Sequence, residues 1–281
     1  MPELPEVQTI VNDLNKKVVG KKIISAWFDF QKMKPVEKAV GHTVKKVVRR
    51  GKNILFYLNK DQILLVHQKM TGHVLVGKWE IDDKKITAVE PEKFKEKVNG
   101  YIHFILTLNN KQMIGLSDLR KFAKVVFGPT EKIENLPDLK NLGPDALEIS
   151  LKEFTENISK RKQTIYQVLM DQGVVSGIGN IYASDVLFEA RVYPFQSANK
   201  LKPQEIEKIW HAIKKILALS LKLRGTSTSD YRDTAGEPGT YTDHRLIYDR
   251  EGLPCYECGT KIKRVKRGGR SSYFCPACQK S

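Results

Sequence analysis

Runs of hydrophobic residues separated by polar breaks predict a strand-rich region over residues 22–127. The segments "KIISAWFDF", "VKKVVRRGKNILFYL", "QILLVHQ", "YIHFILTLNN" and "KVVFG" are rich in β-branched and aromatic residues. Turn-like breaks such as "NKDQ" and "NNKQ" separate several of them. We therefore expect an antiparallel β-sandwich or barrel in the first half of the chain.

A helix is expected before these strands. The opening "MPELPE" is typical of a helix start, because proline suits the first turn and carboxylates complement the positive end of the helix dipole. The apolar residues that follow have helical spacing, namely Val7, Ile10, Val11 and Leu14.

The second half of the chain has a helical pattern. Residues 128–147, "GPTEKIENLPDLKNLGPDAL", contain three prolines and no sustained strand pattern, so we place a linker there. The helical segments that follow are "LKEFTENISKR", "TIYQVLMD", "NIYASDVLFEA" and "PQEIEKIWHAIKKILALSLKL". In the last, a stripe expected to face the core comprises Ile206, Ile209, Trp210, Ile213, Ile216 and Leu217.

A long loop follows the last of these helices. Residues 224–245, "RGTSTSDYRDTAGEPGTYTDHR", are rich in Gly, Ser and Thr and exceed the length of an ordinary connector. Such a loop is either mobile or functional.

The composition indicates a folded protein, and the length of the chain predicts about two domains. Hydrophobic residues make up 41% of the 281 residues, and no apolar run approaches the roughly 18 residues of a membrane span. Glu3 and Glu6 stand where a secretory signal would carry basic residues. We expect a cytoplasmic protein with no membrane partner.

The net charge points to a polyanionic partner. Lysine and arginine number 48 against 32 acidic residues, which gives a formal charge of +16. Nucleic acid is favoured over a membrane surface, because no basic amphipathic helix with an apolar face stands out.

All four cysteines lie near the C-terminus with the spacing of a zinc site: Cys255, Cys258, Cys275 and Cys278. Two Cys-x-x-Cys pairs at this separation can place four thiolates around one structural zinc ion. Two local disulfides or a redox pair are the alternatives; an intracellular compartment keeps thiols reduced, and a redox Cys-x-x-Cys does not need a duplicate. The intervening "GTKIKRVKRGGRSSYF" has six basic residues and no acidic one, as expected for a phosphate-binding hairpin.

The N-terminus can also carry chemistry. Methionine before Pro2 is normally removed in cells, which leaves a secondary amine with a pKa of roughly 8, against roughly 10.4 for a lysine side chain. Such an amine can attack the sugar C1′ of a nucleotide, and Glu3 can transfer protons beside it. Glu6 either organises this site or only complements the helix dipole.

Seven motifs in order resemble the formamidopyrimidine-DNA glycosylase family. They are "PELPEV", "RRGKNIL", "HQKMTG", "DLRKF", "GIGNIYASD", "IYDREGLPC" and the four-cysteine finger. Together they span essentially the whole chain.

The resemblance implies an α+β multidomain protein. Its parts would be an N-terminal β-sandwich domain with an N-terminal helix over residues 1–130, a helix-two-turns-helix domain with a lesion-capping loop over 131–240, and a zinc-finger β-hairpin over 241–281. It also implies a monomeric glycosylase and abasic-site (AP) lyase that excises oxidised purines from damaged double-stranded DNA and cuts the strand by β,δ-elimination.

The resemblance also assigns roles to individual residues. Pro2 would be the nucleophile, Glu3 the general acid and base, and Lys52 a catalytic lysine that contacts phosphate; without the motif, Lys52 would be interpreted as a solvated charge. Three residues would fill the gap left by a flipped base, Met70, Arg120 and Phe122. Without the motif, Met70 and Phe122 would be core residues, and Arg120 and Phe122 would share a side only in an extended segment. Further phosphate contacts would be His67, Asn180, Tyr248 and Arg270.

The chain departs from the family pattern at two informative positions. Tyr166 stands where the family usually carries a lysine, which puts lesion preference and turnover in question, and Asp185 stands where glutamate is usual. The closest rival is the endonuclease VIII group, which prefers oxidised pyrimidines. Leu4, where that group has glycine, favours the purine enzyme. A non-catalytic zinc-finger protein that binds nucleic acid is the rival of another class.

Overall fold

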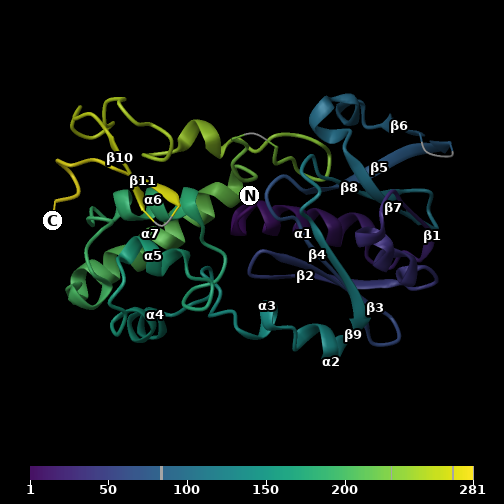
Figure 1. Cartoon of the computed structure of the whole chain (residues 1–281), viewed down its shortest axis with the longest axis horizontal. Helices are drawn as coiled ribbons and strands as arrows, with labels where there is room; N and C mark the ends of the chain where they lie inside the picture. The colour runs from purple at the N-terminus through teal and green to yellow at the C-terminus, as the bar shows by residue number, and fades with distance from the viewer. Residues whose placement is uncertain (83–84, 229, 268, 281) are drawn as a thin grey trace. The chain divides into compact units, whose positions relative to one another are not determined.

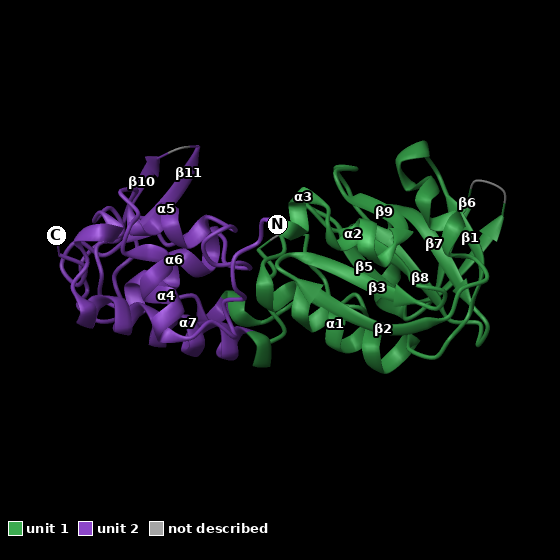
Figure 2. Ribbon diagram, turned by 90° about the horizontal axis from the view of Figure 1, so that it is seen from below, with its two compact units in different colours: residues 1–140, 221–242 green, residues 141–220, 243–281 purple. Residues whose placement is uncertain are grey.

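The computed structural model describes residues 1–82, 85–228, 230–267 and 269–280. The chain forms two compact units, coloured separately in Figure 2. Unit 1 comprises residues 1–140 and 221–242, and unit 2 comprises residues 141–220 and 243–281. Residues 221–242, most of which the resemblance assigns to the helix-two-turns-helix domain, thus group with unit 1. Among the described residues, no helix has the length and apolar character needed to cross a membrane.

Unit 1 is built on two antiparallel sheets, labelled in Figure 1. One sheet has the order β1 (Ile23–Phe28), β7 (Ile102–Leu108), β8 (Met113–Ser117), β5 (His73–Asp82) and β6 (Lys85–Glu90). The other has the order β2 (Val44–Arg50), β3 (Asn53–Leu58), β4 (Gln62–His67) and β9 (Lys124–Pro129). Since each sheet ends in edge strands, the arrangement is a sandwich and not a barrel.

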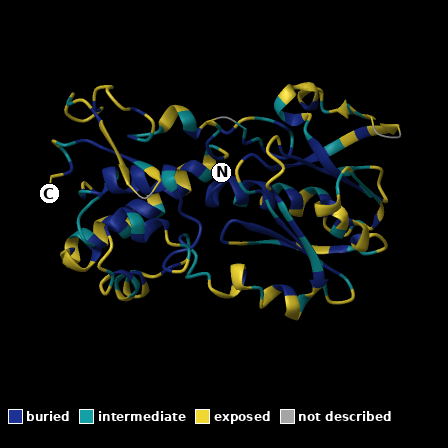
Figure 3. Cartoon of the chain, viewed as in Figure 1, coloured by how far each residue is buried: buried dark blue, intermediate teal, exposed yellow. Residues whose placement is uncertain are grey.

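The two sheets share one hydrophobic core. Phe56 and Leu64, which lie opposite each other on β3 and β4, join Val74 of β5 and Phe104 of β7 in a single buried cluster. The strand interiors are accordingly buried in Figure 3. Alternate residues along β3 face this core, as the period of two in a strand requires.

The predicted N-terminal helix is α1 (Leu4–Val18). Glu3 is its N-cap residue, and Pro5 lies in the first turn, where a missing N–H costs nothing. All four residues of the predicted stripe are buried in the sandwich core. The described chain of unit 1 also contains two short helices within the predicted linker, α2 (Thr130–Glu134) and α3 (Pro137–Lys140).

Four longer helices belong mainly to unit 2: α4 (Leu151–Ile158), α5 (Ile165–Met170), α6 (Asn180–Glu189) and α7 (Pro203–Lys222). The Ser150 and Thr164 side chains cap α4 and α5 by accepting backbone N–H groups. On α7 the predicted stripe is buried except for Trp210, which lies at its edge and donates to the Ile149 carbonyl oxygen at 2.9 Å.

The C-terminal hairpin consists of β10 (Lys263–Arg267) and β11 (Arg270–Phe274). It packs beside α6 through a small buried cluster that includes Phe188, Ile247, Tyr273 and Cys275. Every residue of β10 is exposed. This hairpin therefore has little hydrophobic core of its own.

A histidine is buried in the sandwich. His73 on β5 is 1% exposed, and its Nε2 lies 3.0 Å from the Asn99 Oδ1. Burial lowers the pKa of His73 to about 4. Since an unfolded histidine titrates near 6.5, the unfolded chain binds more protons than the folded chain between these two pH values.

We expect this histidine to destabilise the fold in acid. As pH falls from about 6.5 toward 4, one such group lowers the free energy of unfolding by up to about 1.4 kcal/mol per pH unit. His73→Gln should reduce that dependence, as measured by urea unfolding at pH 7 and pH 5. His211→Gln, at an exposed position of α7, is the matched control. An unchanged pH dependence in His73→Gln would contradict the assignment.

Candidate functional site

The N-terminal residues are buried at the start of α1. Pro2 is buried and Glu3 is only 3% exposed, whereas Met1 is nearly half exposed at 45%. The Pro2 nitrogen is part of the peptide bond to Met1, so it becomes a nucleophilic amine only when Met1 is removed. The predicted nucleophile and the predicted proton carrier are thus adjacent and shielded from water.

Glu6 connects the start of α1 to a distant loop. Its Oε2 accepts a hydrogen bond from the Glu3 N–H at 2.8 Å, and its Oε1 accepts one from the Thr226 N–H at 2.7 Å. The Tyr231 hydroxyl donates to the Glu6 carbonyl oxygen at 3.3 Å. Glu6 therefore binds both the helix end and the loop, so it does more than complement the helix dipole, and its part in catalysis stays a prediction.

Gly225 allows the loop to approach Glu6. A Cβ atom at this position would lie 2.7 Å from the Glu6 Oε1, and the backbone φ of +88° is one that glycine adopts without strain. A side chain here would have to displace the carboxylate.

Ion pairs anchor the same loop to α1. Arg224 pairs with Asp13 of α1 and with Asp233 of the loop, the latter at 2.6 Å. The Thr234 hydroxyl donates to the Asp13 Oδ2 at 2.9 Å. Residue 229, in the segment that the resemblance assigns to lesion capping, lies outside the described residues. The described part of this loop belongs to unit 1.

Lys52 and His67 lie at one end of the four-stranded sheet. Lys52, in the turn between β2 and β3, is only 7% exposed, which contradicts its interpretation as a solvated charge. Asn53, the next residue, pairs in register with His67 at the end of β4.

The ring of His67 is a neutral donor near pH 7. Burial, together with the charges of Lys69 and Lys52, lowers the pKa of His67 to about 4. The Lys69 N–H donates to the His67 Nδ1 at 2.9 Å, so the ring proton is on Nε2. That N–H has the chemistry to donate to a phosphate oxygen.

The three predicted gap-filling residues are exposed. Met70 is 45% and Phe122 is 47% exposed, so neither is a core residue. The Arg120 guanidinium lies over the Phe122 ring, 4.6 Å from its centroid. The segment is a turn in which Lys121 has φ of +56°, and not the extended strand that the sequence argument required. The two side chains meet because the backbone reverses at Lys121.

Two buried polar residues that the sequence analysis did not select hold these loops together. The Thr71 hydroxyl donates to the Asp118 Oδ1, and the Arg120 N–H donates to the Thr71 Oγ1 at 3.1 Å. The other Asp118 oxygen accepts from the Ala123 N–H at 2.8 Å. Both residues belong to the quoted motifs "HQKMTG" and "DLRKF", which is the signal that could have identified them.

In unit 2, Asn180 is the first residue of α6, as the sequence predicted, and Tyr248 lies in the segment before the zinc finger. Asp185 on α6 is completely buried and accepts the N–H groups of Leu246, Ile247 and Tyr248 at 3.1–3.2 Å. Asp185 thereby fixes the backbone that carries Tyr248. Its role was not evident from the sequence.

Arg270, the first residue of β11, is exposed, and its Nη1 lies 3.5 Å from the Met170 Sδ. It shares the hairpin with the five residues of β10, four of which are basic, "KRVKR". The hairpin therefore presents a concentrated positive charge.

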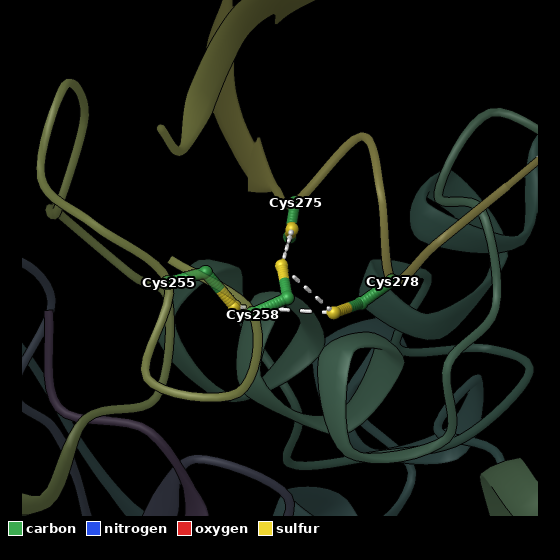
Figure 4. Close-up of side chains that lie close together, drawn as sticks. All are labelled: Cys255, Cys258, Cys275 and Cys278. Atoms are coloured by element: carbon green, nitrogen blue, oxygen red, sulfur yellow. Dashed lines mark hydrogen bonds between the residues drawn. The ribbon is translucent and has the colours of Figure 1, made fainter. Parts of the chain in front are cut away.

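The four cysteine side chains point toward one another in Figure 4. All four Sγ atoms lie within 4.8 Å of one another, and the separations include 3.4 Å for Cys258–Cys278 and 4.0 Å for Cys255–Cys278. Tetrahedral zinc with Zn–S bonds of roughly 2.3 Å requires sulfurs about 3.8 Å apart. The set fits one structural zinc ion, with two ligands before the hairpin and two after it.

We predict that Cys258→Ser loses this metal. Removing one thiolate should lower zinc affinity by more than about 100-fold. Atomic absorption after dialysis would then detect about one zinc per wild-type chain and little in the variant. Ala277→Ser adds a hydroxyl between two ligands without removing a thiolate and should retain zinc. Full occupancy in Cys258→Ser would contradict the four-thiolate site.

Family models match most of the chain in three segments. Residues 1–125 match the formamidopyrimidine-DNA glycosylase N-terminal domain, residues 142–232 match the H2TH domain of the same enzyme, and residues 252–280 match a zinc finger found in FPG and IleRS. The zinc-finger match agrees with the geometry of the cysteines.

Whole proteins with the same domains are similar along their full length. The formamidopyrimidine-DNA glycosylase of Desulforamulus reducens is 35% identical, with 100% of both chains covered. That of Desulfitobacterium hafniense is 36% identical over 99% of this chain and 100% of the relative.

Solved structures agree with this relationship. MutM (Fpg) from Thermus thermophilus superposes with a TM-score of 0.84 at 30% identity, covering 99% of this chain and 98% of that one. Lactococcus lactis Fpg in complex with a DNA that contains N7-benzyl-Fapy-dG gives 0.86 at 29% identity, with 100% of both chains covered. The sandwich, the helical region and the four-thiolate zinc finger thus identify this chain as a member of the formamidopyrimidine-DNA glycosylase family.

Proposed function

We propose that this protein is a bifunctional DNA glycosylase and AP lyase that excises 8-oxoguanine and formamidopyrimidines during base excision repair. The observation that carries the proposal is the N-terminus, where Pro2 precedes a buried Glu3 whose N–H is held by Glu6. The family relationship supports the same chemistry, since relatives carry this name and some are solved with Fapy-dG DNA.

In the proposed reaction, the Pro2 amine forms a bond to the sugar C1′ while the glycosidic bond breaks and the purine leaves with a proton. Glu3 takes the proton from the Pro2 nitrogen, the lone pair of which then opens the C1′–O4′ bond to give an iminium, and Glu3 returns the proton to O4′. Removal of a C2′ proton expels the 3′ phosphate, and a second elimination expels the 5′ phosphate. Water finally releases the sugar fragment from Pro2.

Two neighbouring residues, Glu6 and Lys52, would assist this reaction. Glu6 holds the Glu3 backbone through its Oε2, so it acts as a positioning residue. Lys52, buried in the turn between β2 and β3, would contribute a positive charge toward a phosphate at the lesion.

Base removal from a duplex requires that the nucleotide be flipped out and its place filled. The exposed Met70 and Phe122 supply apolar surface, and the Arg120 guanidinium supplies donors for the opposite base. Thr71 and Asp118, which join the two loops, would keep these side chains together during insertion.

Each unit would offer its own contacts to the duplex backbone. The neutral His67 offers an N–H donor, Asn180 lies at a helix N-terminus, and Arg270 begins a basic hairpin. Tyr248, fixed through Asp185, completes the set. Because such contacts release counterions, binding should weaken as salt increases.

Two sequence features favour oxidised purines over oxidised pyrimidines. Leu4 follows Glu3, and the gap-filling residues come from separate loops, as in the purine enzymes that the chain resembles. The intact trio of Pro2, Glu3 and Lys52 disfavours a non-catalytic binding protein. We further propose that the enzyme acts as a monomer on damaged double-stranded DNA in the cytoplasm.

We predict that borohydride traps a covalent adduct between the protein and a duplex that contains 8-oxoguanine opposite cytosine. Reduction converts the iminium into a stable amine, so peptide mapping should locate the cross-link at Pro2. Mass spectrometry must first confirm that Met1 has been removed. The same duplex with an undamaged guanine is the negative control.

Absence of both adduct and cleavage, with Pro2 exposed as the N-terminus and the duplex bound, would contradict activity on 8-oxoguanine. An abasic duplex run in parallel shows whether the lyase chemistry is intact. A duplex with an oxidised pyrimidine tests the endonuclease VIII alternative.

We predict that Gly225→Ala slows iminium formation by about tenfold, because its Cβ would displace the Glu6 carboxylate. Gly41→Ala is the matched control: Gly41 has a similar φ of +87° but no atom within 4 Å of the added Cβ. Both variants should lose about 1–2 kcal/mol of stability through backbone strain. Only Gly225→Ala should trap more slowly on an abasic duplex, and equal trapping rates would contradict the role of Glu6.

A further inference from the structure

One face of the short helix α5 contacts two of the predicted DNA-binding residues. Tyr166 and Met170 are one turn apart on this face. The Tyr166 hydroxyl contacts the Asn180 side chain, and the Met170 sulfur accepts from the Arg270 guanidinium at 3.5 Å. Asn180 and Arg270 are far apart in sequence, yet the same helix supports both.

The environment of Tyr166 differs from that of a phosphate-binding lysine. The residue is 1% exposed, and its ring is among the largest fully buried side chains of the described chain. Its hydroxyl lies 2.8 Å from the Ser271 carbonyl oxygen on β11 and in hydrogen-bonding contact with the Asn180 Oδ1. Tyr166 therefore joins the start of α6 to the zinc-finger hairpin.

The proton count at this hydroxyl determines how Asn180 is oriented. A tyrosine hydroxyl has one proton, and the Ser271 carbonyl oxygen can only accept. Both contacts are satisfied when the Tyr166 proton goes to Ser271 and the Asn180 amide turns its NH2 group toward the Tyr166 oxygen. One amide N–H then engages Tyr166, and the amide has a second N–H that can donate to a phosphate oxygen.

The backbone of Asn180 is fixed as well. The Ser184 hydroxyl, one turn along α6, donates to the Asn180 carbonyl oxygen at 3.0 Å. With its backbone in the first turn of α6 and its amide on Tyr166, the side chain has little rotational freedom to lose when it binds a ligand.

We propose that Tyr166 is a positioning residue for DNA binding, which aligns the Asn180 amide and couples it to the hairpin that carries Arg270. This proposal rests on the proposed function. In this chain a buried, neutral tyrosine stands at the position where the resemblance implies a lysine. Tyr166 therefore brings no positive charge to the DNA, and instead holds neighbouring phosphate-binding side chains in place before the DNA binds.

The test compares Tyr166→Phe with Tyr182→Phe. Both substitutions remove one buried hydroxyl and keep the ring in the core of unit 2; the Tyr182 hydroxyl contacts Ser220 at 2.6 Å, away from the proposed contacts. Fluorescence anisotropy would measure the Kd for a duplex that contains a tetrahydrofuran abasic analogue. We expect Tyr166→Phe to raise Kd about fivefold and Tyr182→Phe to change it less than twofold.

Two further readouts separate positioning from a merely structural role. At saturating enzyme, the trapping rate on an abasic duplex should be unchanged in Tyr166→Phe, because the substitution weakens binding and not chemistry. In a protein that already carries Asn180→Ala, Tyr166→Phe should raise Kd much less than it does in the wild type. Melting temperatures and zinc content of the two tyrosine variants should be alike.

The proposal is overturned if Tyr166→Phe binds as tightly as Tyr182→Phe, or if its effect is fully additive with Asn180→Ala. A fall in the trapping rate at saturation would also contradict it. If the wild-type protein neither binds nor cleaves the duplex, the proposed function itself fails. Binding by the wild type with an unaffected Tyr166→Phe refutes only the role of Tyr166.

Discussion

The buried carboxylate of Glu6 is the interaction on which the N-terminal site depends. Removing a carboxylate from water is costly unless hydrogen bonds replace its solvation. Here one oxygen accepts from Glu3 and the other from Thr226, a residue 220 positions away. These two hydrogen bonds form together only when the loop that follows α7 has folded onto α1. The N-terminal end of α1 and that loop are thereby held together.

The same arrangement recurs beside other predicted DNA contacts. Asp118 is buried and collects donors from the two loops that carry the predicted gap-filling residues. Asp185 is buried and collects three consecutive N–H groups of the segment that carries Tyr248. In each case a carboxylate with no solvent contact fixes the backbone next to a side chain that we expect to contact DNA. Such support reduces the entropy lost when those side chains bind a ligand.

The zinc-finger end of unit 2 combines a small buried cluster with polar and metal contacts. The buried cluster beside the hairpin contains few large side chains, so zinc coordination compensates for limited hydrophobic burial. Tyr166 adds a hydrogen-bonded connection from the helices to β11. The basic residues of β10 can remain exposed because the four cysteines at the ends of the hairpin stabilise its fold, and the charged strand face does not.

Local patterns in the sequence were sufficient for much of this protein. Helix α1, the strand-rich region and the helical region follow from residue spacing, which reports contacts between residues a few positions apart. The four cysteines predicted the zinc site, because their paired spacing already restricts the geometry. Ordered motifs identified the family and led to the prediction that Pro2 is the nucleophile. These features require no knowledge of distant neighbours.

The tertiary structure alone decided the partners of the polar residues. Sequence could not choose between two roles for Glu6, since the second depends on Thr226. It could not show that Met70 and Phe122 are exposed, nor that a turn at Lys121 brings Arg120 over the Phe122 ring. The contact from Tyr166 to β11 spans 105 positions. Periodicity carries no information about such pairings, because they arise only when distant segments pack together.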